Sequence, residues 1–183
     1  GDENAVRICT EDRNDGIHKP ALDLQILKDL AIHTGTTGEE NPTAGLMDRG
    51  PFTKEYEVVN TDRNIGTRTA GRVAEIYENH GLPAESIDLT FRGSAGQSFG
   101  TFLCGGIKLT LIGEGNDYVG KGLSGSTIVI KLSDESNLIS NENTIIGNTV
   151  LYGATSGKLF ASGQAGDRFA VRNSGALTVI EGC

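Results

Sequence analysis

Short apolar segments, in which every second residue is hydrophobic, recur along the second half of this chain. The segment SIDLTFRG at residues 86–93 is one of them, and three later segments follow the same period. Their apolar positions are Ile107, Leu109 and Leu111, then Ile128, Ile130 and Leu132, then Leu177 and Val179. A period of two places such side chains on one face of a β-strand, because successive side chains point to opposite faces. The pattern therefore predicts short strands that each bury one face.

The first 92 residues follow a different pattern, in which two segments have helical spacing. The apolar positions of the first segment are Leu22, Ile26, Leu27 and Leu30, and Gly35 follows as a terminator. We expect a helix over residues 21–32.

A second helix is expected over residues 67–81, TRTAGRVAEIYENHG. Val73, Ile76 and Tyr77 share one face of it, and Gly81 marks its end. Between the two helices, EYEVVNT at residues 55–61 favours a short strand.

Four glycine-bounded segments repeat in the second half of the chain, and each runs into a strand. They open at Gly96, Gly115, Gly147 and Gly166, which are 19, 32 and 19 residues apart. The long interval contains the polar segment SDESNLISNENT at residues 133–144, whose removal restores a spacing of about 19. We therefore interpret it as an insertion in one repeat.

Glycine is the composition outlier, at 26 of 183 residues, while proline is only 4. A period near 20 with short strands and glycine bends is typical of a β-solenoid, because tight bends need residues that tolerate positive φ or close backbone approach. We expect structural glycine corners at Gly93, Gly96, Gly100, Gly106, Gly115, Gly120, Gly122, Gly125, Gly147, Gly153, Gly157, Gly163, Gly166 and Gly175. Asn116 and Asn148 occupy equivalent repeat positions, and we expect each to cap a turn through its own or a neighbouring backbone.

Charge and cysteine content exclude several classes of protein. Sixteen Lys and Arg against 24 Asp and Glu give a net charge of −8, and no basic cluster favours nucleic acid or an anionic membrane. No run of 18 apolar residues predicts a membrane span. The three cysteines, Cys9, Cys104 and Cys183, are far apart and odd in number, which indicates a reduced, cytoplasmic compartment without a disulfide framework.

The candidate chemical motifs favour structural roles. Gly120, Gly122 and Gly125 match G-x-G-x-x-G, but a strand follows them where a dinucleotide site needs a helix, and Lys121 lacks the Ser or Thr of a phosphate loop. The three histidines, His18, His33 and His80, lack partners at ligand spacing, so no metal site is predicted.

Cys104 precedes two glycines at a bend, and no histidine lies near it in the sequence, so we expect a small packed side chain rather than a nucleophile. For one group of polar residues on the turns we expect ordinary surface ion pairs, and interdomain docking is the alternative. The residues concerned are Asp117, Tyr118, Asp167, Arg168 and Arg172.

Several segments together resemble one known family. GSAGQSFG, GNDYVGKGLSG, IIGNTVLYGATSGKLFASGQAGDRFAVRNSGA and the closing EGC are similar to the carboxy-terminal GXGXG domain of the glutamate synthase large subunit. NTDRNIGT and TEDRNDGIHKPALD extend the resemblance over nearly the whole chain. The resemblance implies a mainly β fold, a right-handed single-stranded parallel β-helix over residues 86–183, preceded by a helical and irregular N-terminal segment over residues 1–85.

What the resemblance implies about function is a noncatalytic scaffold in glutamate biosynthesis and ammonia assimilation. The parent enzyme's cysteine amidotransferase and its barrel with FMN and an iron–sulfur cluster are other domains, so we expect no catalytic, cofactor-binding or metal-binding residue in this chain. The partners would be those domains or subunits, and self-association stays open. Family members continue beyond the position of Cys183, and this chain begins at Gly1 rather than Met. We therefore expect a fragment whose last turn frays or pairs between molecules.

Two alternatives remain open at this point. One is a free-standing GXGXG subunit that assembles with separate synthase subunits, or a scaffold like the GXGXG-containing subunit of formylmethanofuran dehydrogenase. The other is an enzyme that uses Cys104 or the glycine-rich bends, for which the sequence offers no reaction.

Overall fold

The computed structural model describes residues 20–183 of this chain. Cys9 and His18 therefore lie outside the described residues. The helices are α1 (Leu22–Thr34), α2 (Leu46–Arg49) and α3 (Thr67–Tyr77), with two short 3₁₀ helices, η1 (Glu78–His80) and η2 (Ser140–Glu142). The strands are β1 (Phe52–Val58), β2 (Ile87–Ala95), β3 (Ile107–Gly115), β4 (Ser124–Lys131), β5 (Thr144–Ile146), β6 (Ser156–Ala165) and β7 (Leu177–Gly182).

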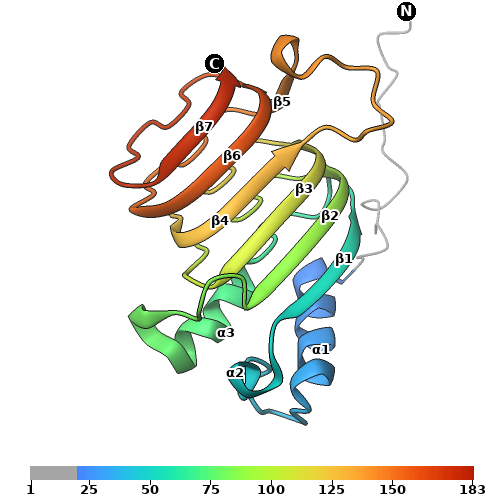
Figure 1. Ribbon diagram of the computed structural model, residues 1–183, viewed down its shortest axis with the longest axis vertical. Helices are drawn as coiled ribbons and strands as arrows, with labels where there is room; N and C mark the ends of the chain where they lie inside the picture. The colour runs from blue at the N-terminus through green and yellow to red at the C-terminus, as the bar shows by residue number, and fades with distance from the viewer. Residues whose placement is uncertain (1–19) are drawn as a thin grey trace, which may run out of the picture.

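All seven strands belong to one sheet, and every pairing between them is parallel. Figure 1 shows β1, β2, β3, β4, β6 and β7 side by side in this order, with α1 and α3 near the β1 end. Because neighbouring strands run in the same direction, each connection must carry the chain back to the end of the sheet at which the previous strand began. The prediction of a mainly β fold with parallel strands is confirmed.

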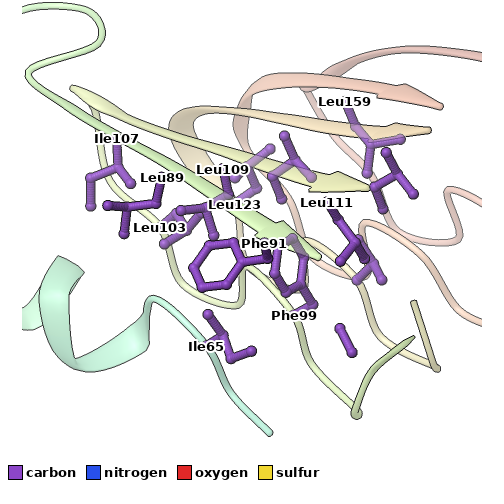
Figure 2. Packing of buried hydrophobic residues seen from close by; sticks show 14 of the residues in the cluster. Ile65, Leu89, Phe91, Phe99, Leu103, Ile107, Leu109, Leu111, Leu123 and Leu159 are labelled. Carbon is purple, nitrogen blue, oxygen red and sulfur yellow. The ribbon is translucent and has the colours of Figure 1, made fainter. Parts of the chain in front are cut away.

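The hydrophobic core runs across the sheet in rows of paired residues. One row pairs Leu89 with Leu109, Ile128 and Leu159, and a second pairs Phe91 with Leu111, Ile130 and Ala161. The side chains of both rows are buried, with exposed fractions of 0% apart from 6% at Ala161. Figure 2 shows members of both rows, Leu89, Phe91, Leu109, Leu111 and Leu159, in one cluster with Phe99, Leu103 and Leu123 from the connecting segments. Alternation in the sequence thus identified the inner face of β2, β3 and β4. The prediction was wrong for Leu177 and Val179 of β7, whose side chains are 55% and 56% exposed, because Thr178 and Ile180 are the β7 residues that continue the two rows.

The first helix begins and ends close to its predicted range. Gly35 caps it with a φ of 75°, as expected of a glycine terminator. Ile26 and Leu30 are fully buried, whereas Leu27 is only partly buried.

The second predicted helix is shorter than expected, because α3 stops at Tyr77 and the 3₁₀ helix η1 covers Glu78–His80, before Gly81. Val73 is fully buried and Tyr77 partly buried. Ile76, at the same helical spacing, is 41% exposed. Helical spacing gives the direction of a side chain but does not show whether a neighbouring element covers it.

The sheet starts earlier in the sequence than the alternating segments suggested. The strand expected over residues 55–61 is β1 at Phe52–Val58, and it pairs along its whole length with β2. Lys54 pairs with the buried Leu89 but is itself exposed, so β1 has a weaker alternation than β2, β3 and β4. The polar insertion emerges between β4 and β5 as the loop that carries η2 (Figure 1).

Candidate functional site

The connections that lead to β2, β3, β4, β6 and β7 contain turns with the same backbone conformation. Residues at alternate positions of these turns have φ values from 54° to 90°, in the left-handed region. They form three turn columns: Asn64, Ser98, Tyr118, Thr149 and Arg168 in the first; Gly66, Gly100, Gly120, Leu151 and Ala170 in the second; and Phe102, Gly122, Gly153 and Arg172 in the third.

Hydrogen bonds between successive turns hold these columns in register. From the second turn onwards, the second-column N–H donates to the carbonyl of the residue before its counterpart in the preceding turn, at 2.8 to 3.0 Å. The pairs are Gly100 to Ile65, Gly120 to Phe99, Leu151 to Val119 and Ala170 to Val150. In the opposite direction, the N–H groups of Phe102 and Gly122 donate to the carbonyl groups of Lys121 and Tyr152 in the following turn. The turns therefore stack as regularly as the strands do.

Alternate left-handed positions give a physical reason for a sequence pattern in which glycine alternates with other residues. Glycine adopts this conformation freely, whereas another residue gives up about 1 kcal/mol or more of stability there. Several positions in this chain nevertheless carry non-glycine residues, among them Phe102, Tyr118 and Arg172.

The predicted glycine corners fall into two groups. Gly96, Gly100, Gly106, Gly120, Gly122, Gly147, Gly153, Gly166 and Gly175 lie in the connections, whereas Gly93, Gly115, Gly125, Gly157 and Gly163 lie within strands β2, β3, β4 and β6. At Gly122, a Cβ atom would contact the Phe102 ring of the preceding turn. Glycine is needed there because the aromatic side chain covers the position.

Gly113, which the sequence interpretation missed, is the most restricted glycine of the sheet. It pairs with Gly93 across the β2–β3 ladder and has a φ of 146°. A Cβ atom at Gly113 would contact the carbonyl oxygen of Gly93, a backbone atom that cannot move aside alone. Two paired glycines within adjacent strands could have indicated such a close approach.

The repeat register predicted at Asn116 and Asn148 was wrong by one residue. The Tyr118 N–H donates to the Asn148 carbonyl, and the Ser98 N–H donates to the Asp117 carbonyl, so Asp117 is the counterpart of Asn148. Gly115 ends β3 and pairs with Ala95, which leaves Asn116 to open the turn. Both repeats begin with Gly-Asn, and this similarity concealed one extra residue in the earlier repeat.

The side chains at this position connect successive turns. The Asp117 Oδ1 atom accepts a hydrogen bond from the Asn148 N–H at 2.7 Å, and the Asn148 Oδ1 atom accepts one from the Asp167 N–H at 2.8 Å. Asn116 accepts a bond from the neighbouring Asp117 N–H at 2.7 Å. The capping expected of the two asparagines is confirmed, although they occupy different positions.

Two buried carboxylates, which no local sequence pattern indicates, connect α1 to α3 and to the sheet. Asp23 on α1 accepts hydrogen bonds from the N–H groups of Gly66 and Arg68, at 2.7 and 2.8 Å, and so caps the start of α3. Burial raises the pKa of Asp23 above its ordinary value, and the two backbone bonds act in the opposite direction.

Asp29 is the second of these carboxylates and joins α1 to β1. It accepts bonds from the Tyr56 hydroxyl at 2.8 Å and the Gln25 amide at 3.1 Å, and its Oδ2 atom lies 2.9 Å from the Lys54 Nζ atom. Burial acts to raise the pKa of Asp29, but the bonds from Lys54, Tyr56 and Gln25 outweigh it and hold the pKa below its ordinary value of 3.8. The charged form is therefore the one that stabilises the fold.

The replacement Asp29→Asn is expected to lower the free energy of unfolding near neutral pH by about 1 to 3 kcal/mol, because a charged acceptor is lost. A depressed folded pKa stabilises the protein above the unfolded value of 3.8, and this contribution disappears as pH falls through the lower folded value. Urea unfolding from pH 7 to pH 3 measures the difference between the two proteins. That difference should narrow towards acid pH.

The exposed Asp134 provides the control, since its replacement by asparagine should leave the stability nearly unchanged at every pH. A constant gap between wild type and Asp29→Asn across this range would contradict the assigned protonation.

Cys104 is half-buried, and its Sγ atom lies 3.6 Å from the carbonyl oxygen of Ala70. Burial raises its pKa, which reduces the thiolate fraction at neutral pH. His33 contacts the Gly50 carbonyl oxygen at 3.1 Å and packs against the Phe52 ring. These surroundings correspond to packed side chains and provide no activated nucleophile.

Over the residues that the structure describes, no group of His, Cys, Asp or Glu has the arrangement of a metal site. The helices of this same region are too short or too polar to cross a membrane.

A group of exposed and partly exposed aromatic and cationic side chains lies along the turns. We call Phe102, Tyr118, Lys121, Tyr152 and Arg172 the turn face. The Lys121 Nζ atom lies 5.8 Å from the centre of the Phe102 ring and 5.6 Å from that of Tyr118, and the Arg172 guanidinium carbon lies 5.9 Å from the centre of the Tyr152 ring. These contacts form two groups, one on the turns that precede β3 and β4 and one on the turns that precede β6 and β7, and the bond from the Gly122 N–H to the Tyr152 carbonyl joins the backbones of the two groups.

A hollow of about 450 Å³ adjoins this surface at Phe102, and Arg63, Arg68 and Thr101 are among the residues that line it. Of the polar residues proposed from the sequence, the structure brings only Tyr118 and Arg172 into the turn face. Asp117 instead bonds Asn148 of the next turn, and Asp167 and Arg168, in the turn after that, are exposed.

Comparison with known proteins identifies relatives of this chain. The family model described as "GXGXG motif" matches residues 40–183. The chain is 59% identical over 128 residues to the glutamate synthase (NADPH) large chain of Azospirillum brasilense, which covers 70% of this chain and 8% of that protein. It is 48% identical over 163 residues to ferredoxin-dependent glutamate synthase 2 of Synechocystis sp., which covers 89% and 10%. It is 52% identical over 136 residues to the glutamate synthase (NADH) of Saccharomyces cerevisiae, which covers 74% and 6%. The chain thus spans a tenth or less of each of these relatives.

Proposed function

This chain belongs to the GXGXG motif family, and on that basis we propose that it is a noncatalytic scaffold domain of a glutamate synthase. The chain corresponds to a tenth or less of the length of the relatives compared above. Conversion of glutamine and 2-oxoglutarate to glutamate, with FMN and an iron–sulfur cluster, is therefore assigned to other domains or subunits. The names of the relatives include NADPH, NADH and ferredoxin, so similarity alone does not assign an electron donor.

The proposed architecture is a right-handed single-stranded parallel β-helix, in which each strand and its returning connection make one coil. Parallel pairing of successive strands supports it, as do the hydrogen bonds between successive turns. Parallel strands joined through a crossover are right-handed in nearly all proteins. The division at residue 86 remains a prediction, and the family match from residue 40 and the sheet from Phe52 favour an earlier start of the coil.

The observation that carries this proposal is the regularity of the turn columns. Five connections repeat the same alternating left-handed backbone, and their N–H and carbonyl groups bond to the adjacent turns. Such a structure uses its glycines for shape and rigidity. A rigid frame suits a domain that fixes the relation of its neighbours.

The proposal is tested on the native polypeptide that carries this sequence, purified with whatever subunits accompany it. We expect glutamate synthesis from that preparation, whereas the 183-residue chain alone should bind neither FMN nor glutamine in calorimetric titration. The mass of the native polypeptide separates a domain of a long chain from a free-standing subunit. Binding of either FMN or glutamine to the chain alone would refute the scaffold role.

The cytoplasmic location of the protein remains a prediction.

A further inference from the structure

Phe102 occupies a left-handed position where the next two turns have glycine. Its φ is 54°, and its counterparts in the third turn column are Gly122 and Gly153, with φ values of 64° and 68°. The same fold therefore forms with glycine at this position. A phenylalanine here needs another explanation, because its backbone conformation is unfavourable for any residue with a Cβ atom.

The Phe102 ring covers Gly122 and contacts Lys121, but this packing within the described chain leaves much of the ring exposed. The Phe102 side chain is 55% exposed, and Tyr118, at a φ of 62°, is 38% exposed. Both rings lie on the surface of the turns, where the Lys121 ammonium group approaches both of them. Exposed aromatic residues on a rigid backbone are enriched at protein interfaces, where they bury large areas at low conformational cost.

The cations of the turn face also have no carboxylate partner within residues 20–183. Lys54, Arg72, Arg92 and Lys108 each form an ion pair elsewhere on the molecule. Lys121 and Arg172 instead lie against aromatic rings and form no ion pair in this region. The nearby Asp117 carboxylate is engaged by the Asn148 N–H and side-chain amide. On a chain with a net charge of −8, the turn face thus has two cations that form no ion pair with a carboxylate of residues 20–183.

We propose that the turn face is the docking surface for an acidic segment of another part of the same enzyme. The inference rests on the scaffold role proposed above and specifies the surface that performs it. Phe102 is the apolar anchor, and the hollow beside it accepts a side chain of the partner. Lys121 and Arg172 receive carboxylates, since charge complementarity gives a docking surface its orientation.

The test uses the native polypeptide with its accompanying subunits. The double variant Lys121→Glu with Arg172→Glu reverses the charge of the turn face, and Lys131→Glu with Lys158→Glu reverses two exposed lysines of strands β4 and β6 as a matched control. Hydroxyl-radical footprinting then measures the oxidation rates of Phe102 and Tyr118. Reversal at the turn face should raise both rates about tenfold, because like charges displace the partner, and the control should leave them unchanged.

Carbodiimide coupling identifies the occupant, because it joins a lysine amine to a neighbouring carboxylate. We expect Lys121 to be linked to an Asp or Glu outside residues 1–183. Phe102→Gly should reduce this linkage while the melting temperature of the protein stays the same or rises, since the backbone strain is relieved.

Three results would overturn the inference. The oxidation rates of Phe102 and Tyr118 could stay unchanged in the charge-reversed variant, or the carbodiimide links of Lys121 could be confined to residues 1–183 of the same or a second copy. Nuclease treatment could also remove the protection of the two rings from oxidation, which would identify nucleic acid as the occupant. Protection of another face of residues 20–183 would reject the turn face and leave the scaffold role standing. Absence of protection on every face would reject both.

Discussion

Gly113→Ala is expected to lower the free energy of unfolding by about 4 kcal/mol or more, which is exceptional for the addition of one methyl group. The φ of Gly113 is 146°, and a Cβ atom there would contact the backbone carbonyl of Gly93 in the neighbouring strand. The strands β2 and β3 would have to separate at the centre of the sheet. Urea unfolding followed by circular dichroism measures the loss.

Gly153→Ala is the matched control, because the same methyl group there meets no atom within 4 Å. Its φ of 68° still makes the substitution unfavourable, by about 1 kcal/mol. The two variants therefore separate steric overlap from backbone strain. If both lost the same stability, the close approach of β2 and β3 at Gly113 would be refuted.

Phe91→Ala is expected to cost about 3 to 5 kcal/mol, the usual range for removing a buried aromatic side chain. Phe91 is fully buried, its ring lies 5.8 Å from the ring of Tyr56, and it meets the Phe99 ring edge-on at 5.4 Å. These contacts join β1, β2 and the turn that follows β2, so the cavity would open where three parts of the chain meet.

The exposed Phe102 provides the comparison for this experiment. Phe102→Ala in the same chain should change the free energy of unfolding by no more than about 0.5 kcal/mol, because the ring is 55% exposed. Thermal and urea unfolding of both variants measure the contrast. A small loss for Phe91→Ala would show that the inner face of the sheet is packed differently.

Local patterns predicted the strands because alternation is a direct consequence of strand geometry. Ile107, Leu109 and Leu111 all lie on the buried face, and the insertion between β4 and β5 was recognised from its polar composition. The repeat register was less secure, because glycine and asparagine are common in every turn. Only the hydrogen bonds of Asn148 show that Asp117, and not Asn116, is its counterpart.

Long-range contacts account for most of what the sequence did not predict. Asp23 caps a helix whose start lies 43 residues away, and no local spacing indicates that bond. The same limit applies to Asp29, which meets Tyr56 only after α1 packs against β1. Left-handed residues other than glycine, such as Phe102, were missed because the search for bends relied on glycine itself.

Hydrogen–deuterium exchange of the turn amides tests the stacking of the coil most directly. The N–H groups of Gly100, Gly120 and Leu151 donate to the preceding turn, so they should exchange slowly and only as the core strands open. Exchange of these three amides at nearly the rates of an unfolded peptide, while the amides of β3 and β4 remain protected, would contradict a coil held together by its turns.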